Sequence, residues 1–428
     1  MGIHNRKLGL QKNKVIKRKF YLHKYIIFFL WPFLTLLIAI RKFRTQWAMN
    51  IFWLYSIFFG FTFVIVGTEV DAFRYADQLV YYANHSEYNF SLLFSSYLSE
   101  GGNLDIAQIL LTYIVSFFTN DYRYLFAIFG FFMGYFISRY IWLLVKKINI
   151  KLSYFTGLLF ISYALVIGIW DIGGIRWNLA GAIFFFSVLN YFENKNKKYL
   201  WLALTIIFVH WSFSLALLVL LVYLILGNRT SLYFVIFILS FLISEINMDV
   251  VRNYFADYAP IIVQESRGSY LNQGYVDIVS DSKQMVAWYL TYHLLLLKWF
   301  IMASAIYIYI KVQRRERENQ VLFDRLFNFA LFFYGVFNLL STIPSVERFL
   351  YLGSLMFLYI IIIHITFMKN EFPFWLKLIG MPILLLFIIV RIRIGFDYIG
   401  VWSVIANPLM AIFVENEVPL IDIVKGLF

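Results

Sequence analysis

Five short polar segments stand at the ends of long apolar runs, or inside them, and carry side chains that could do chemistry. In the first segment, Glu69 and Asp71 are two positions apart and are followed by Arg74 and Tyr75. Carboxylates at this spacing predict a general base, or ligands of a cation that binds a diphosphate. The alternative interpretation is the start of a solvated loop with local ion pairs.

The second segment begins with Glu100, continues through two glycines and ends at Asp105. One interpretation is a polar site where the chain enters the next apolar run. The other is a glycine turn followed by an aspartate whose side chain caps the next helix. Both interpretations stay open on the sequence alone.

The third segment places Arg176 at the start of an apolar helix, directly after Gly173, Gly174 and Ile175. A guanidinium can bind a diphosphate in bidentate fashion, and the unpaired N–H groups of a helix N-terminus favour the same anion. The alternative is an arginine whose head group extends to the lipid headgroups. We favour the anion site.

The fourth and fifth segments carry a histidine and a second arginine. His210 lies deep in an apolar run, two positions before Ser212, and could act as a base or a phosphate donor. A buried histidine with a purely structural role is the alternative. Arg348 stands at a helix start, before Tyr351, and is expected to bind an anionic partner. The alternative is an ion pair with the neighbouring Glu347.

The elements that position these segments follow from composition. Of the 428 residues, 62% are hydrophobic and 14% charged, whereas soluble domains carry about 25% charged residues. In lipid every backbone polar group must be bonded internally, so only helices or closed barrels can span. Barrel strands alternate in polarity, but runs such as 206–226 and 356–367 are continuously apolar. The sequence therefore predicts an all-α polytopic integral membrane protein.

The expected spans are read from runs near 20 residues long. They lie near 25–40, 48–66, 124–145, 153–170, 177–192, 199–226, 231–246, 284–310, 327–343, 347–367 and 375–391, with shorter runs at 105–119 and 400–414. We expect about 11 to 13 spans. Residues 199–226 form either one long tilted helix or a tight helical hairpin. A GT-C-like arrangement is an open alternative for the fold.

Charge predicts the topology. The first 24 residues carry eight Lys or Arg and no acid, which predicts a cytoplasmic tail at 1–24 and one transmembrane domain at 25–428. The loops 67–105 and 247–283 are rich in acids and are assigned to the outer face. Basic residues at 41–44 also look cytoplasmic, so the short run 25–40, which holds Pro32, is expected not to cross fully.

Several classes of function are excluded or disfavoured. The chain has no cysteine, which excludes disulfides, thiol catalysis and Cys-ligated metals. It has no P-loop, GxSxG or HExxH motif and no clustered metal ligands, so we expect no ATP-driven pump domain, no metal and no cofactor. The net charge of +13 is explained by the basic tail and does not call for a nucleic-acid partner.

In their order and spacing, the five segments resemble the EpsG family of Wzy-type polysaccharide polymerases. The resemblance covers about 50–370. It rests on Asp71…Tyr75, Glu100-Gly101 before a helix, Arg176-x-x-Leu179-Ala180, His210-x-Ser212, and Arg348-Phe349 followed by Tyr351. The sequence departs from the pattern at Trp177, where a glutamine is expected after the arginine.

The resemblance implies a polymerase of the bacterial cytoplasmic membrane. It would join undecaprenyl-diphosphate-linked oligosaccharides at the outer face, for an O-antigen, capsule or exopolysaccharide. Membrane lipids and a chain-length regulator are candidate partners. The expected catalytic residues are Glu69, Asp71 and His210; the expected substrate-binding residues are Arg74, Tyr75, Glu100, Arg176, Ser212, Arg348 and Tyr351.

Two other functions stay open. A GT-C glycosyltransferase that uses a polyprenyl-phosphate sugar would also carry an acidic pair in its first outer loop, as Glu69 and Asp71 would be. A transporter or flippase for the same lipid-linked glycan would need a water-filled cavity with charges in two related halves. Here the charges gather at one face instead.

Overall fold

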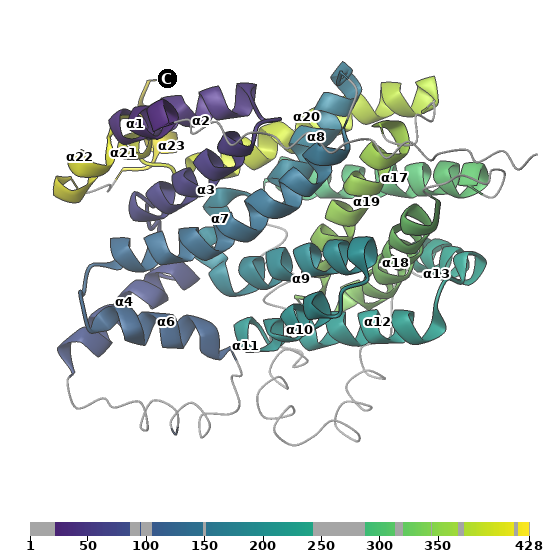
Figure 1. The fold of residues 1–428 in the computed structure, drawn as a ribbon, viewed down its shortest axis with the longest axis horizontal. Coiled ribbons are helices and arrows are strands. Elements are labelled where there is room, and N and C mark those ends of the chain that lie inside the picture. The colour runs from purple at the N-terminus through teal and green to yellow at the C-terminus, as the bar shows by residue number, and fades with distance from the viewer. Residues whose placement is uncertain are drawn as a thin grey trace, which may run out of the picture.

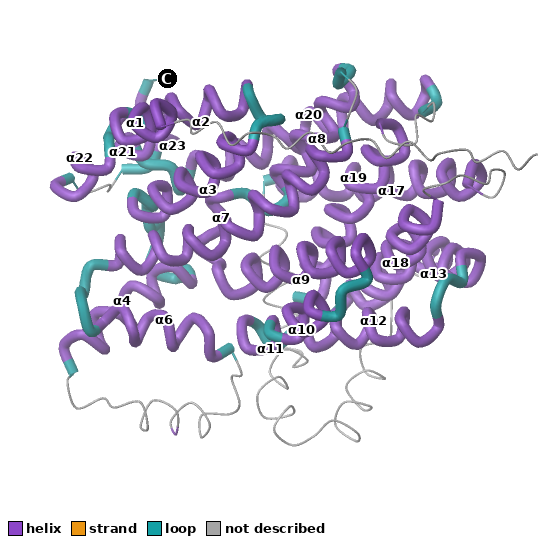
Figure 2. Tube along the Cα trace, in the orientation of Figure 1, coloured by secondary structure: helices purple, strands orange, loops and turns teal. Residues whose placement is uncertain are grey.

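The fold is built from helices packed against one another. The computed structural model describes residues 22–85, 95, 105–148, 151–242, 287–312, 320–343, 345–366, 372–414 and 418–427. Over these ranges there are helices and two isolated β-bridges, Phe63–Ile399 and Gly400–Pro419, but no strand (Figure 2). The predicted loop 247–283, Glu100 and most of the tail 1–24 lie outside the described residues.

The helices of the first half are α1 (Leu22–Leu30), α2 (Pro32–Arg41), α3 (Gln46–Phe61), α4 (Asp71–Asn84), α6 (Ile106–Ser116), α7 (Tyr122–Lys147), α8 (Tyr154–Leu165), the 3₁₀ helix η1 (Ile169–Gly174) and α9 (Ile175–Asn194). Those of the second half are α10 (Lys198–Leu204), α11 (Ile206–Val209), α12 (Phe213–Leu226), α13 (Thr230–Leu242), α17 (Trp288–Val312), α18 (Gln320–Leu339), η3 (Leu340–Thr342), η4 (Val346–Arg348), α19 (Phe349–Thr366), α20 (Phe374–Phe396), α21 (Val401–Ile405), α22 (Pro408–Phe413) and α23 (Leu420–Gly426). Figure 1 shows their arrangement, with α3 beside α7 and α4 beside α6.

Six helical stretches in the described ranges are long and apolar enough to cross a membrane. They are Tyr122–Lys147, Tyr154–Asn194, Trp288–Lys311, Val321–Leu339, Val346–Thr366 and Phe374–Phe396. This confirms the prediction of an all-α polytopic membrane protein. The stretch Tyr154–Asn194 joins two predicted spans, and the total of 11 to 13 spans stays a prediction.

The first apolar run is broken into two short helices. Trp31 has extended backbone (φ −154°, ψ 90°) between α1 and α2, and Pro32 begins α2. Helices of 9 and 10 residues each extend about 15 Å, roughly half of the hydrocarbon thickness. Whether residues 25–40 cross the membrane fully stays a prediction.

Small residues let α3 and α7 approach closely. A Cβ on Gly60 would lie 2.1 Å from the carbonyl oxygen of Phe126, and a Cβ on Gly130 would lie 2.2 Å from that of Ser56. Ser56 and Gly60 are four apart on α3, and so are Gly130 and Gly134 on α7. Both helices thus present the small-xxx-small pattern that packs helices tightly in membranes.

Changing Gly130 to alanine is expected to lower the thermal stability of the purified protein. The new methyl group would collide with backbone rather than with a movable side chain, and such overpacking costs about 1–3 kcal/mol. Gly157→Ala in α8 is the matched control, since nothing lies within 4 Å of its Cβ position. Thermal unfolding in detergent compares the two, and equal midpoints would contradict the close contact.

The run 199–226 forms a tight helical hairpin. Extended backbone at His210 (φ −156°, ψ 113°) ends α11, and α12 begins three residues later. Tyr199 of α10 lies near Phe186, with ring centroids 6.0 Å apart, so the first arm runs back along α9. Phe213 packs near Phe184 and Tyr223 near Phe192. The second arm therefore runs parallel to α9, with residues 210–212 at the tip.

Candidate functional site

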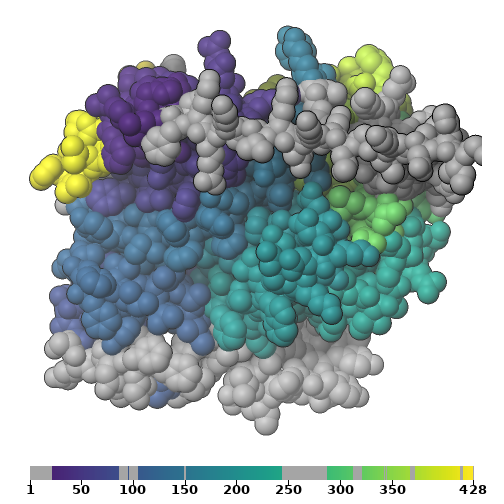
Figure 3. All heavy atoms as spheres, viewed as in Figure 1, coloured from purple at the N-terminus to yellow at the C-terminus, as the bar shows by residue number. Residues whose placement is uncertain are grey.

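Four segments that are far apart in the sequence meet beside α4, α6 and α11, which lie together in Figure 1. They are the first turn of α4, the residue before α6, the start of α9 and the tip of the hairpin. In the space-filling view, the surfaces near α6 and α7 (blue) and near α10 and α12 (teal) adjoin on this face (Figure 3). We call Asp71, Tyr75, Asp105, Arg176 and His210 the Asp105 cluster.

Arg176 connects three of these segments. Its Nε donates to the hydroxyl of Tyr75 at 2.9 Å. Its Nη1 lies 3.5 Å from Oδ2 of Asp105, and its Nη2 lies 3.5 Å from Oδ1 of Asp71. The contact with Tyr75 is an ordinary hydrogen bond, whereas the contacts with the two carboxylates are long. The Nη1 and Nη2 atoms of Arg176 therefore form only weak hydrogen bonds with the two carboxylates.

The local sequence explains why Arg176 reaches α4. The 3₁₀ helix η1 precedes α9 and packs against α4. A Cβ on Gly173 would lie 3.3 Å from the ring of Phe63 and 3.7 Å from Cβ of Ala72. Glycine at this position lets the turn lie directly on α4, so the first turn of α9 faces Asp71 and Tyr75.

Asp105 and His210 form a hydrogen-bonded pair. Oδ2 of Asp105 lies 2.7 Å from Nδ1 of His210, and Oδ1 accepts the backbone N–H of Trp211 at 2.6 Å. The Asp105 side chain is only 3% exposed. An ionised carboxylate can only accept, so Nδ1 carries the hydrogen; in the neutral form of the imidazole, the lone pair is then on Nε2.

The position of Asp105 settles one question that the sequence left open. Asp105 occupies the N-cap position of α6, but its side chain makes no capping hydrogen bond there. Both carboxylate oxygens engage the hairpin tip instead. The helix-capping interpretation is therefore wrong for this side chain. Asp105 belongs to the cluster, although it was not among the catalytic or substrate-binding residues expected from the sequence.

The surroundings keep Asp105 ionised. Burial raises the pKa of the carboxyl, but the hydrogen bond and charge of His210, the N–H of Trp211 and the charge of Arg176 outweigh it, and the pKa is lowered. Because the folded-state pKa lies below that of the unfolded chain, this ionised group contributes stability above the ordinary carboxyl range. That contribution is lost as the pH falls through the lowered value.

Tyr75 stays neutral beside these charges. Burial, the largest cause, raises the pKa of its hydroxyl to about 12, although the charge of Arg176 opposes the rise. The hydroxyl oxygen accepts from Arg176, so the hydroxyl hydrogen is not used in that bond. Tyr75 can therefore donate to an oxygen of a ligand bound at Arg176.

Glu69, Arg74 and Ser212 are predicted site residues that are described by the structure but are not members of the cluster. Glu69 is exposed and lies outside the cluster, although Asp71, two residues later, belongs to it. Arg74 pairs with Asp71, but its side chain is 67% exposed. Ser212 follows the hairpin tip, and its Oγ is buried with no hydrogen-bond partner among the described residues. Glu100 lies outside the described residues.

Three aromatic rings connect the cluster to the start of α19. Trp177 lies near Phe213 and Phe349, with ring centroids 5.7 and 6.1 Å apart, and the latter two rings are 5.0 Å apart. These rings follow Arg176, Ser212 and Arg348 in the sequence, so the contact brings the three motifs into one region. Nε1 of Trp177 has no partner in the described ranges. Trp177 therefore packs against aromatic rings and does not make the polar contact that a glutamine would make there.

Asp71 and Asp105 face arginine rather than each other. Across the described residues, no group of three or more His, Asp or Glu side chains gathers in a way that could hold a metal. Arg176 bridges the two carboxylates instead. The cluster thus places a guanidinium beside two carboxylates and an imidazole, with no ligand set for a cation visible in those ranges.

The family comparison covers this whole region. The model of the EpsG family matches residues 48–401. The chain belongs to the EpsG family. No curated protein and no solved structure matches it. The match confirms the resemblance found in the sequence and supports a polysaccharide polymerase in general. The matched region contains every residue of the Asp105 cluster.

The side of the membrane on which this EpsG protein carries Glu69 can be tested by labelling. A cysteine at exposed position 69, in an otherwise cysteine-free chain, is expected to react with a membrane-impermeant maleimide added to intact cells. A cysteine at Lys195, the exposed residue that ends α9, should react only after permeabilisation, because basic loops stay inside. The reverse pattern would invert the topology.

Proposed function

We propose that this protein is a polysaccharide polymerase at the outer face of the bacterial cytoplasmic membrane. It transfers a growing glycan from undecaprenyl diphosphate to a sugar hydroxyl of a lipid-linked repeat unit. The observation that carries the proposal is the Asp105–His210 pair beside Arg176. A histidine with a free Nε2 and an arginine whose Nη1 and Nη2 form only weak hydrogen bonds supply the two groups that such a transfer needs.

The proposed reaction is a single displacement. Nε2 of His210 accepts the proton of the acceptor hydroxyl, and that oxygen forms a bond to the anomeric carbon of the growing glycan. The bond between this carbon and the diphosphate oxygen breaks, and its electron pair leaves with the diphosphate. The proton on His210 then passes to water or to the released diphosphate.

The other members of the cluster assist this step. Asp105 holds the imidazole in the tautomer with a free Nε2 and stabilises the imidazolium that forms. Arg176 neutralises the charge that develops on the diphosphate, by exchanging its 3.5 Å contacts with carboxylates for phosphate oxygens. Tyr75 donates its hydroxyl hydrogen to the same leaving group.

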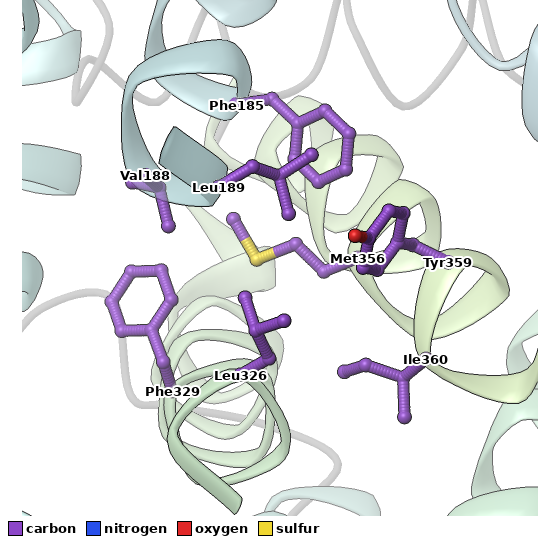
Figure 4. Close-up of a pocket in the computed structure, with 8 residues that line it drawn as sticks. All are labelled: Phe185, Val188, Leu189, Leu326, Phe329, Met356, Tyr359 and Ile360. Carbon is purple, nitrogen blue, oxygen red and sulfur yellow. The ribbon is translucent and has the colours of Figure 1, made fainter. Parts of the chain in front are cut away.

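The two other candidate functions receive less support. In the GT-C interpretation, Glu69 and Asp71 would act as a pair, but Asp71 is bound by Arg74 and Arg176 while Glu69 lies outside the cluster. For a transporter, the helix bundle would need a polar cavity. One cavity among the described residues, between α9, α18 and α19, is about 10 Å³ and is lined by apolar side chains and Tyr359, so this cavity could not hold a glycan (Figure 4).

Reconstitution tests the proposal directly. Purified protein in liposomes is supplied with lipid-linked repeat units, without nucleotide sugar or ATP. A ladder of glycan lengths supports polymerisation. Transbilayer movement of the lipid without a ladder would favour a flippase and refute the proposal. In a deletion strain, single complete repeat units should accumulate, whereas units lacking one sugar would favour a GT-C transferase.

Arg348→Ala is expected to lower the polymerisation rate by about 10²-fold, through loss of a cation near the leaving diphosphate. Arg348 is exposed at the end of η4 and makes no ion pair within the described ranges. Its removal should therefore leave the thermal stability unchanged, in contrast to changes inside the Asp105 cluster. A wild-type chain length at normal expression would remove Arg348 from the site.

A further inference from the structure

A second ion pair is buried next to the Asp105 cluster. Arg391 of α20 is 7% exposed, although the sequence placed it at the end of an apolar run; α20 continues to Phe396. Its Nη2 binds Oδ2 of Asp171 in η1. Its Nε donates to the carbonyl of Leu165 at 2.9 Å, and Nη2 lies 3.3 Å from that of Val166. The proposed reaction uses neither Arg391 nor Asp171.

This pair satisfies the backbone where the long apolar stretch Tyr154–Asn194 is broken. The last carbonyls of a helix have no partner within it, and in a membrane unpaired backbone groups are costly. Arg391 donates to two carbonyls at the end of α8. Asp171 accepts the N–H of Gly168 at 2.7 Å. The pair therefore holds residues 165–171 from both sides, which a lysine with a single ammonium could not do.

The break that the pair holds leads directly into the first turn of α9. The side-chain amide of Asn178 donates to the carbonyl of Asp171 at 2.9 Å and to that of Gly174 at 3.0 Å. Asp171 is thereby tied to the turn that carries Arg176. On the other side, a Cβ on Gly395 would lie 2.8 Å from the ring of Trp170, so α20 lies directly on η1.

The same pair also lies near the second cationic motif. Tyr351, in the first turn of α19, interacts electrostatically with Arg391 and Asp171, and also with Glu347 and Arg348. The ion pair thus lies within electrostatic range of the first turn of α19, which follows Arg348.

We infer that the Asp171–Arg391 ion pair is a positioning device, which holds the start of α9 so that Arg176 faces Asp105 and His210. The inference rests on the proposed function for its catalytic consequence. Its structural part, the ordering of residues 165–176, does not depend on that function. Arg391 and Asp171 are therefore positioning residues and do not touch the substrate.

The experiment compares Arg391→Gln and Arg391→Lys with the matched control Arg393→Gln. Arg393 lies two residues along α20 and pairs with Asp397, the residue that follows the helix; the two side chains are 34% and 30% exposed. Backbone hydrogen exchange in nanodiscs is expected to be at least about tenfold faster at residues 165–176 in Arg391→Gln. In liposomes its kcat should fall by about 10²-fold with KM for the lipid-linked acceptor unchanged, since small misplacements are that costly.

Arg391→Lys is expected to give an exchange rate and a kcat between those of the wild type and Arg391→Gln. If the glutamine variant does not reconstitute, Arg391→Lys is compared with the wild type in its place. Wild-type exchange at 165–176 would overturn the inference. Faster exchange with an unchanged kcat would show that the pair is structural only, which also overturns it. A wild-type protein that makes no ladder would instead refute the proposed function and the catalytic consequence, while the exchange data still decide the ordering.

Discussion

Replacing His210 by alanine is expected to lower the rate of glycan polymerisation by about 10²–10⁴-fold, the range that a general base supplies. Nε2 of His210 is the free base of the Asp105–His210 pair, and alanine removes it without creating a new charge. The affinity for the lipid-linked acceptor should change little, because the lost interaction forms during the reaction. Ladder formation in liposomes at several acceptor concentrations separates the two parameters.

Two further variants sharpen this result. Asp105→Asn keeps the size of the side chain but removes the carboxylate that fixes the tautomer of His210, so it should lose activity nearly as severely. His85→Ala is the matched control, because His85 is exposed at the end of α4 and stacks on Tyr81 outside the cluster. If His210→Ala kept more than half of the wild-type rate, His210 could not be the base.

The sequence predicted the membrane fold from the lengths of the apolar runs and placed a boundary between the runs 153–170 and 177–192, but it did not predict which residues stabilise the chain at that boundary. Hydropathy reports where a chain can enter lipid, not where a helix ends inside it. The chain at the break before α9 is stabilised by Arg391, which donates to the carbonyl of Leu165 from more than 200 residues away along the sequence. Its backbone groups are satisfied by a tertiary partner, which no local pattern contains.

The same reason explains the partial success at the site. Asp71, Tyr75, Arg176 and His210 were selected because ionisable groups beside apolar runs are costly and thus usually functional, and the structure brings them together. Asp105 carried an equally good local explanation as a helix cap. Its partner His210 lies 105 positions away, so only the folded hairpin distinguishes the two roles.

Arg176→Ala is expected to abolish polymer, with a loss of at least about 10³-fold, the upper range for removing one group that stabilises charge in a transition state. Among the described residues, the guanidinium is the group that contacts Asp71, Tyr75 and Asp105 together. Its removal leaves two carboxylates near the position of the diphosphate without their shared cation. Arg393→Gln, at a partly exposed ion pair, should polymerise normally.

Arg176→Lys separates neutralisation of the leaving group from support of the cluster. A lysine keeps the charge but lacks the planar fork whose Nε, Nη1 and Nη2 face Tyr75, Asp105 and Asp71 separately. If Arg176 serves the diphosphate, the lysine variant should retain more activity than the alanine variant at equal thermal stability. If Arg176 only holds Asp71 and Asp105 together, both variants should lose stability, and Asp71→Ala should restore it in the alanine background. Restored stability with restored polymer would assign Arg176 to the fold and not to the reaction.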